Sequence, residues 1–306
     1  MKQTPSTFSV ALRYAHPAML FLGVVFYTLG IGIAKYLGQP INWTRFGLGL
    51  VLVLLLQLMS YFLKAYYDLI NAGSPLQRMQ KDEPDENKRI ERYLPRQNVL
   101  LLAATVMAAG AAMTVLLYTI GATNLGVFVF IGICFLLSYF YAVPPVRLVD
   151  NGYGELTEAI LLTNLFPGLA YLIQTGDLHR LLAMITFPLL LIFLAARLAL
   201  SLGKYPRDLQ YGQKTMMIAL GWQKGLHIHN WLVLGAYLMI ALAFGLRLPW
   251  SLTWPGLLTL PIGLFEIIQI NQISAGARPN WKLLNFTSVT LLGLTVYFIS
   301  LALWTV

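Results

Sequence analysis

The chain has 306 residues, of which 58% are hydrophobic and only 11% are charged, against roughly 25% charged in an ordinary soluble protein. This composition excludes a soluble globular core and indicates an integral membrane protein. The formal net charge of +9 lies mostly in loops on one side of the apolar segments. This one-sided distribution is typical of a membrane protein that follows the positive-inside rule, so we expect no nucleic-acid partner.

Long apolar runs predict nine membrane-spanning helices, because about 20 apolar residues are needed to cross roughly 30 Å of hydrocarbon. The first run has no small-residue cleavage site after it, so we expect a retained helix rather than a signal peptide. The predicted fold is all-α, with 1–306 forming a single transmembrane domain. The nine helices are placed at 16–36, 44–67, 98–119, 123–142, 155–175, 180–202, 225–246, 251–271 and 283–304.

Positive residues are distributed unequally between the two sides of the predicted helices. Of the 21 Lys and Arg, 16 fall on the side of the N-terminus, four fall on the other side, and Arg197 lies within a helix. The positive-inside rule then places the N-terminus in the cytoplasm, together with the long polar loops 68–97, 143–154 and 203–224. We expect any chemistry on that face, and we expect 68–97 to be an extended cytoplasmic loop.

The second predicted helix ends in YFLKAYYDLINAG, which places Lys64 and Asp68 four residues apart on one helical face. One interpretation is a snorkelling lysine beside a boundary carboxylate. The other is a polar site built at the helix end. The following loop carries KDEPDENK at 81–88. Its four acids fit a solvated charged loop, and an alternative hypothesis makes them metal ligands.

The loop between the fourth and fifth helices reads YAVPPVRLVDNGYGELTEAI, residues 141–160. Pro144 and Pro145 end one helix, while Glu155 and Glu158 open the next near its positive dipole end. Further along the fifth helix, Asn164 has two interpretations, which are a pocket-lining residue and an interhelical hydrogen bond.

The sixth helix leads into SLGKYPRDLQYGQKT, residues 201–215, where Lys204 and Asp208 repeat the spacing of the first pair. Arg207 and Lys214 add two further cations to this segment. Within the helix itself, Arg197 is expected to face a cavity or to pair with a carboxylate, because an arginine is costly in the membrane.

Polar residues in the last three helices carry weaker signals. Glu266 and Gln269 can line a pocket or form hydrogen bonds between helices. His227 and His229 are two residues apart, so they do not share one helical face, which argues against a metal site. Tyrosines near the cytoplasmic ends fit an interfacial belt or an aromatic lining that stabilises a cation. These tyrosines are Tyr66, Tyr67, Tyr139 and Tyr141.

Three segments, in this order along the chain, resemble the UbiA superfamily of membrane prenyltransferases. NKRIERYLPRQNVLLLAATV at 87–106 loosely resembles the family's R-P-L-P-S-G-R-x-S and the helix after it. YAVPPVRLVDNGYGEL at 141–156 is similar to its Y-x-x-P-P-x-R-L…G-x-G-E-L, and GQKTMMIALGWQKG at 212–225 is similar to its G-K-x-T-L-x-x-x-L-G. The resemblance implies a helical bundle around a central cavity. It also implies a prenyl diphosphate held under the cytoplasmic loops by Mg²⁺ and two aspartate-rich motifs.

The motifs of this chain depart from the family pattern. Alignment puts Lys64 at the Asn of the first motif and Lys204 at the first Asp of the second, which leaves Asp68 and Asp208 as the implied catalytic and metal-binding residues. Because Lys and Arg bind phosphate oxygens directly, we expect Mg²⁺ binding to be weakened or lost. The implied substrate-binding residues are Lys64, Lys204, Arg207, Lys214, Arg147, Arg197, Tyr67, Tyr141 and Asn164.

The implied function is transfer of an isoprenoid from a prenyl diphosphate to an aromatic or lipid acceptor by an integral membrane enzyme. Two alternatives stay open. One is a terpene cyclase on the same scaffold, in which the ionised chain attacks itself. The other is a non-catalytic relative that binds a prenyl or lipid group.

Overall fold

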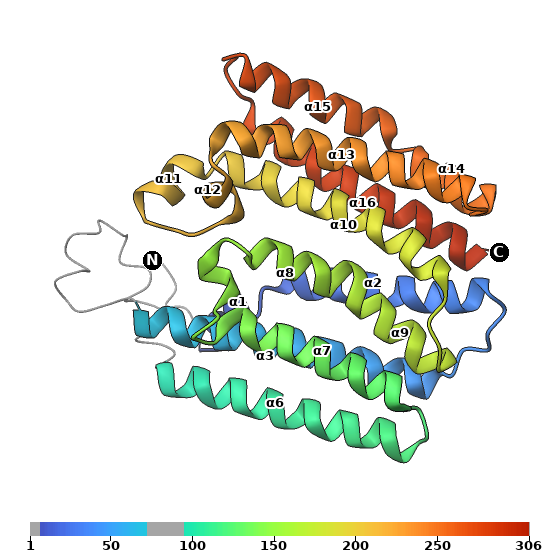
Figure 1. Ribbon diagram of the computed structural model, residues 1–306. Helices are drawn as coiled ribbons and strands as arrows, with labels where there is room; N and C mark the ends of the chain where they lie inside the picture. The colour runs from blue at the N-terminus through green and yellow to red at the C-terminus, as the bar shows by residue number, and fades with distance from the viewer. Residues whose placement is uncertain (1–6, 72–94, 306) are drawn as a thin grey trace. The chain divides into compact units, whose positions relative to one another are not determined.

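The computed structural model describes residues 7–71 and 95–305, and every regular element in these residues is helical (Figure 1). The chain divides into two compact units, each with its own internal packing. Unit 1 combines Met1–Val25 with Trp43–Arg147, and unit 2 combines Phe26–Asn42 with Leu148–Val306.

Unit 1 is built on the long helix α3 (Trp43–Asn71), against which α6 (Arg96–Thr119) and α7 (Leu125–Ala142) pack (Figure 1). It also holds α1 (Thr7–Tyr14) and the first part of α2 (Pro17–Tyr36). Buried positions on α6 recur at helical spacing and include two small residues, which let helix backbones approach closely in a membrane. These positions are Val99, Ala103, Gly110 and Leu117.

Unit 2 holds the remaining helices, the second part of α2, and a short 3₁₀ turn after α7. Its central helix α10 packs against both α13 and α16, and α13 packs in turn against α15 (Figure 1). The elements are the 3₁₀ turn η1 (Leu148–Asn151), α8 (Gly154–Ile160), the π-helical segment η2 (Leu161–Leu165), α9 (Phe166–Thr175), α10 (Arg180–Leu202), α11 (Tyr205–Gln210), α12 (Met216–Leu220), α13 (Trp222–Gly245), α14 (Trp250–Leu257), α15 (Leu260–Ser274) and α16 (Trp281–Thr305).

An apolar cluster in unit 2 surrounds the end of α10 that leads into α11. Leu198 and Leu202 of α10 pack there with Met217 of α12, Leu226 of α13 and Leu284 of α16, all of them buried. This packing anchors the polar segment 203–215 to the helical core, because α12 contributes one of the buried side chains.

The all-α fold class and the nine candidate membrane spans are confirmed for the described residues. The predicted helix at 155–175 is interrupted by the π-helical segment η2, and the predicted helix at 251–271 is divided between α14 and α15. Proline explains the second break, because Pro255 lies inside α14 and Pro261 opens α15. The cytoplasmic N-terminus and the single functional domain stay predictions. Most of the predicted loop 68–97 lies outside the described residues.

Candidate functional site

The end of α3 carries an ion-pair cluster in unit 1. Lys64 Nζ lies 3.0 Å from Asp68 Oδ2, and Arg147 Nη2 donates to Asp68 Oδ1 at 2.5 Å. Both carboxylate oxygens of Asp68 therefore have a cationic partner. The side chain of Asp68 is 47% exposed and that of Arg147 only 7%, so the arginine is the buried, fixed member of the cluster.

The backbone of Arg147 adopts an unusual conformation for a residue with a side chain. Its φ is +36°, in the left-handed region that non-glycine residues seldom occupy. Its backbone N–H donates to the carbonyl of Val143 at 3.0 Å, and its guanidinium lies 6.0 Å from the centre of the Tyr67 ring. Such conformations persist where the surroundings hold them in place, and they gather at functional sites.

A second polar cluster joins α8 to α10 in unit 2. Arg197 Nη2 lies 3.1 Å from Glu158 Oε2, so the arginine of α10 pairs with a carboxylate, one of its two predicted roles. Close by in the sequence, Glu155 Oε2 accepts a hydrogen bond from the Met216 backbone N–H at 3.1 Å. This contact links the G-x-G-E-L segment to the start of α12.

A close backbone approach reinforces this link. Gly152 has a φ of +78°, and a Cβ added there would lie 2.7 Å from the Cβ of Ala219 in α12. Glycine is required on both counts, since a larger residue would be strained and would displace α12. Two of the segments that resemble family motifs, 141–156 and 212–225, are therefore in contact through Gly152 and Glu155.

The Lys204–Asp208 pair follows α10, which ends at Leu202 as predicted. Lys204 is the N-cap residue of the short helix α11 and Asp208 lies within that helix, and the Asp208 N–H donates to the Lys204 carbonyl at 2.8 Å. Partial burial raises the pKa of the Asp208 carboxyl, while the charges of Lys204 and Arg207 oppose that rise. The guanidinium of Arg207 lies 5.7 Å from the centre of the Tyr211 ring, and Lys214 is exposed.

Other predicted residues have partners within the helical core of unit 2. Asn164 accepts a hydrogen bond from Thr186 Oγ1 at 2.9 Å, an interhelical contact between η2 and α10. Gln269 donates to Thr287 Oγ1 at 3.3 Å. These bonds match the structural interpretation of both residues, and the pocket-lining role of Asn164 stays a prediction. Tyr141 is buried in α7 of unit 1.

A buried polar cluster at Glu266 was only partly foreseen. His229 Nε2 of α13 lies 3.2 Å from Glu266 Oε1 of α15, and Ser288 Oγ of α16 donates to the same oxygen. Sequence inspection selected Glu266 without its partners, because the three residues lie on three different helices. Among the described residues, no group of three or more His, Cys, Asp or Glu side chains is arranged to hold a metal ion.

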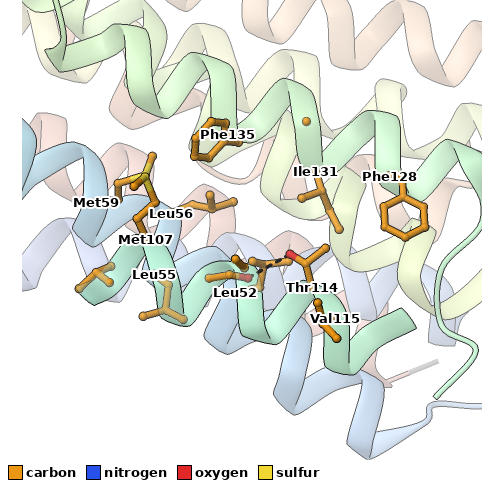
Figure 2. A pocket seen from close by; sticks show the side chains of 14 residues that line it. Leu52, Leu55, Leu56, Met59, Met107, Thr114, Val115, Phe128, Ile131 and Phe135 are labelled. Atoms are coloured by element: carbon orange, nitrogen blue, oxygen red, sulfur yellow. Dashed lines mark hydrogen bonds between the residues drawn. The ribbon is translucent and has the colours of Figure 1, made fainter. Parts of the chain in front are cut away.

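Unit 1 also contains an apolar groove of about 540 Å³ between α3, α6 and α7 (Figure 2). Its polar lining side chain, Thr114, donates its hydroxyl to the Gly110 carbonyl at 3.0 Å, so the groove offers no free donor from this residue. Met59 lies nine residues before Asp68, which turns it about 180° around α3. The groove and the ion-pair cluster thus lie on opposite faces of that helix. The lining residues are Leu52, Leu55, Leu56, Met59, Val106, Met107, Gly110, Ala111, Thr114, Val115, Phe128, Ile131, Gly132 and Phe135.

Comparison with known families identifies the chain. A sequence model described as the UbiA prenyltransferase family matches residues 79–303. The chain belongs to this family. Together with the nine candidate membrane spans found in the described part of the chain, this membership makes it an integral, multi-pass membrane protein.

Solved structures agree with the fold. A structure of digeranylgeranylglyceryl phosphate synthase is similar over 98% of this chain and 99% of that chain, with a TM-score of 0.63 and 13% identity. A UbiA homologue from Archaeoglobus fulgidus bound to GPP and Mg²⁺ covers 95% of this chain and 100% of its own, with a TM-score of 0.59 and 16% identity. The same homologue bound to Cd²⁺ has a TM-score of 0.62 over the same shares. No curated protein sequence matches this chain significantly.

The described residues of the two motifs do not fit a magnesium ion. Mg²⁺ requires a near-octahedral set of oxygen ligands, whereas Asp68 is a single carboxylate whose two oxygens each bind a cation already, which places positive charge next to any metal ion. In the second motif, Asp208 is a single carboxylate flanked by Lys204 and Arg207. The four acids of 81–88, which were predicted as alternative ligands, lie outside the described residues.

Proposed function

We propose that this protein is a membrane prenyltransferase that transfers an isoprenoid from a prenyl diphosphate to an aromatic or lipid acceptor. Family membership supports the reaction class, and a structural neighbour is bound to GPP. The observation that carries the proposal is the ion pair of Asp68 with Arg147. It connects the helix end that resembles the first family motif to the Y-x-x-P-P-x-R segment, as a shared site requires.

The residues of this chain act mainly through charge in the proposed reaction. Lys and Arg side chains donate charge-assisted hydrogen bonds to diphosphate oxygens, and they stabilise the negative charge that grows on the diphosphate as its bond to the prenyl carbon breaks. Lys64 supplies such a cation in unit 1. In unit 2, Lys204, Arg207 and Lys214 supply three more within the segment 203–215. The catalytic role predicted for Asp208 stays part of this proposal.

Product analysis tests the proposed reaction. Purified protein in nanodiscs is incubated with labelled prenyl diphosphates of several lengths and a crude lipid extract, and prenylated products and released diphosphate are measured. Wild-type protein and the control Lys282→Gln are expected to form product, whereas Lys204→Gln and Lys214→Gln are expected to lose most of it. Product formation that is equal in all four proteins would exclude a role for the segment 203–215.

The same assay separates the two alternatives. A terpene cyclase would release diphosphate and form a hydrocarbon product without any acceptor. A binding-only relative would retain the prenyl diphosphate and release nothing. The ion pairs of both Asp68 oxygens favour the binding-only alternative over the cyclase, because the two cations compete with a metal ion for this carboxylate.

A further inference from the structure

The cluster at the end of α3 has the composition of an anion-binding site. Lys64 and Arg147 carry two positive charges, and Asp68 carries one negative charge, so these three side chains together carry a net charge of +1. The ammonium of Lys64 has three N–H donors, and one of them faces Asp68 Oδ2 at 3.0 Å. Its side chain is 30% exposed. Its other two donors make no hydrogen bond among the described residues and can bind an oxygen-rich anion.

Asp68 orients both cations. Its two oxygens bind Lys64 and Arg147 separately, which fixes the two cationic groups on either side of one carboxylate. The buried Arg147 is further held by its left-handed backbone and by the ring of Tyr67. A preorganised pair of cations binds an anion better than two mobile ones, because less conformational freedom is lost on binding.

We propose that Lys64, Asp68 and Arg147 form a metal-independent clamp for the diphosphate head group of a prenyl diphosphate. In this clamp, Asp68 is a positioning residue for the two cations and does not bind a metal. The inference rests on the proposed function, since it names how that substrate is recognised. It also reverses the role that the family resemblance implied for Asp68.

Substitution of Asp68 separates the two roles by whether its effect depends on Mg²⁺. Asp68→Asn removes a negative charge from the cluster and the acceptor of Lys64, while the amide oxygen can still accept from Arg147. In the clamp, the ratio of the affinities of Asp68→Asn and wild type for geranyl diphosphate is therefore the same with Mg²⁺ and with EDTA. If Asp68 is instead a metal ligand, the same substitution weakens binding strongly with Mg²⁺ and not with EDTA, because a neutral amide is a poor ligand for Mg²⁺.

The experiment measures the affinity of radiolabelled geranyl diphosphate for protein in phosphatidylcholine nanodiscs, with Mg²⁺ or with EDTA. We expect EDTA to change the affinity less than twofold and Lys64→Gln to lower it at least tenfold. The control Lys282→Gln removes an exposed lysine elsewhere and is expected to bind like the wild type. Gel filtration and circular dichroism of each variant confirm that the fold is retained.

Two results would overturn the clamp. The first is binding that requires Mg²⁺ and is lost in Asp68→Asn, and the second is no binding of geranyl diphosphate under either condition. Nanodiscs that contain phosphatidic acid test a lipid phosphate as the source of the anion. Displacement of geranyl diphosphate by an equal concentration of phosphatidic acid would contradict a site for prenyl diphosphate.

The clamp and the proposed reaction can fail separately. Metal-dependent binding with normal product formation would remove the clamp and leave prenyl transfer in place. Binding that resists EDTA, without product or released diphosphate for any acceptor, would leave the clamp and remove prenyl transfer.

Discussion

The buried cluster of His229, Glu266 and Ser288 provides a strong test of what stabilises unit 2. The side chains of His229 and Glu266 are both 0% exposed, and their contact of 3.2 Å joins α13 to α15. Glu266 Oε1 accepts from Ser288 as well, while Glu266 Oε2 has no hydrogen-bond partner among the described residues. Among the described residues, Glu266 therefore makes its side-chain polar contacts through Oε1 alone.

Of the two single substitutions His229→Leu and Glu266→Leu, the first is expected to lower the free energy of unfolding more. It leaves Glu266 buried with Ser288 as its remaining partner, and breaking a buried pair in this way costs about 3–5 kcal/mol. Glu266→Leu should cost less, about 1–3 kcal/mol. The reason is that the Ser288 hydroxyl still donates to the Leu284 carbonyl at 2.8 Å and His229 still contacts Asn230.

The double variant His229→Leu with Glu266→Leu makes the prediction quantitative. Its cost should be close to that of Glu266→Leu alone, because removal of the acid also removes the uncompensated polar group. The measurement is the apparent free energy of unfolding in bicelles by SDS titration for the wild type, both single variants and the double variant. Costs that add within about 0.5 kcal/mol, as for independent sites, would refute the coupling.

Three further predictions concern packing and charge. Gly132→Leu is expected to raise the thermal midpoint more than Gly293→Leu. Both positions are sterically open and both substitutions gain helix propensity, but only the Leu side chain at position 132 fills the groove. Equal rises of the two midpoints would contradict this. Gly30→Ala should lower the midpoint by an amount equivalent to about 1–3 kcal/mol, since its Cβ would overlap the backbone of Pro167, and an unchanged midpoint would count against that packing. Burial raises the pKa of Asp208 from its usual 3.8, so its contribution to stability is present below that value and is lost as pH rises through the folded pKa. The thermal midpoint of Asp208→Asn relative to that of the wild type should therefore rise between pH 3.5 and pH 7, and a fall over this range would contradict a raised pKa of Asp208.

The spans of this protein could be predicted because hydrophobicity is a local property of the chain. A run of about 20 apolar residues identifies a membrane helix whatever surrounds it. The interruptions were harder to foresee, because the π-helical segment at Leu161–Leu165 depends on its packing partners rather than on its composition. One contact with such a partner is the hydrogen bond from Thr186 of α10 to Asn164 of that segment, which joins residues 22 positions apart.

The role of Asp68 shows why the candidate site was only partly predictable. Spacing within one helix correctly placed Lys64 next to Asp68, since residues four apart share a helical face. The partner that changes the chemistry is Arg147, which is 79 positions away and approaches from the turn after α7. With Lys64 alone, one Asp68 oxygen would be without a cationic partner. With Arg147 both oxygens bind cations, which disfavours a metal ion at this carboxylate by charge repulsion. The long-range contact therefore separates a metal ligand from a positioning carboxylate, and the Mg²⁺ dependence of the Asp68→Asn effect measures that difference.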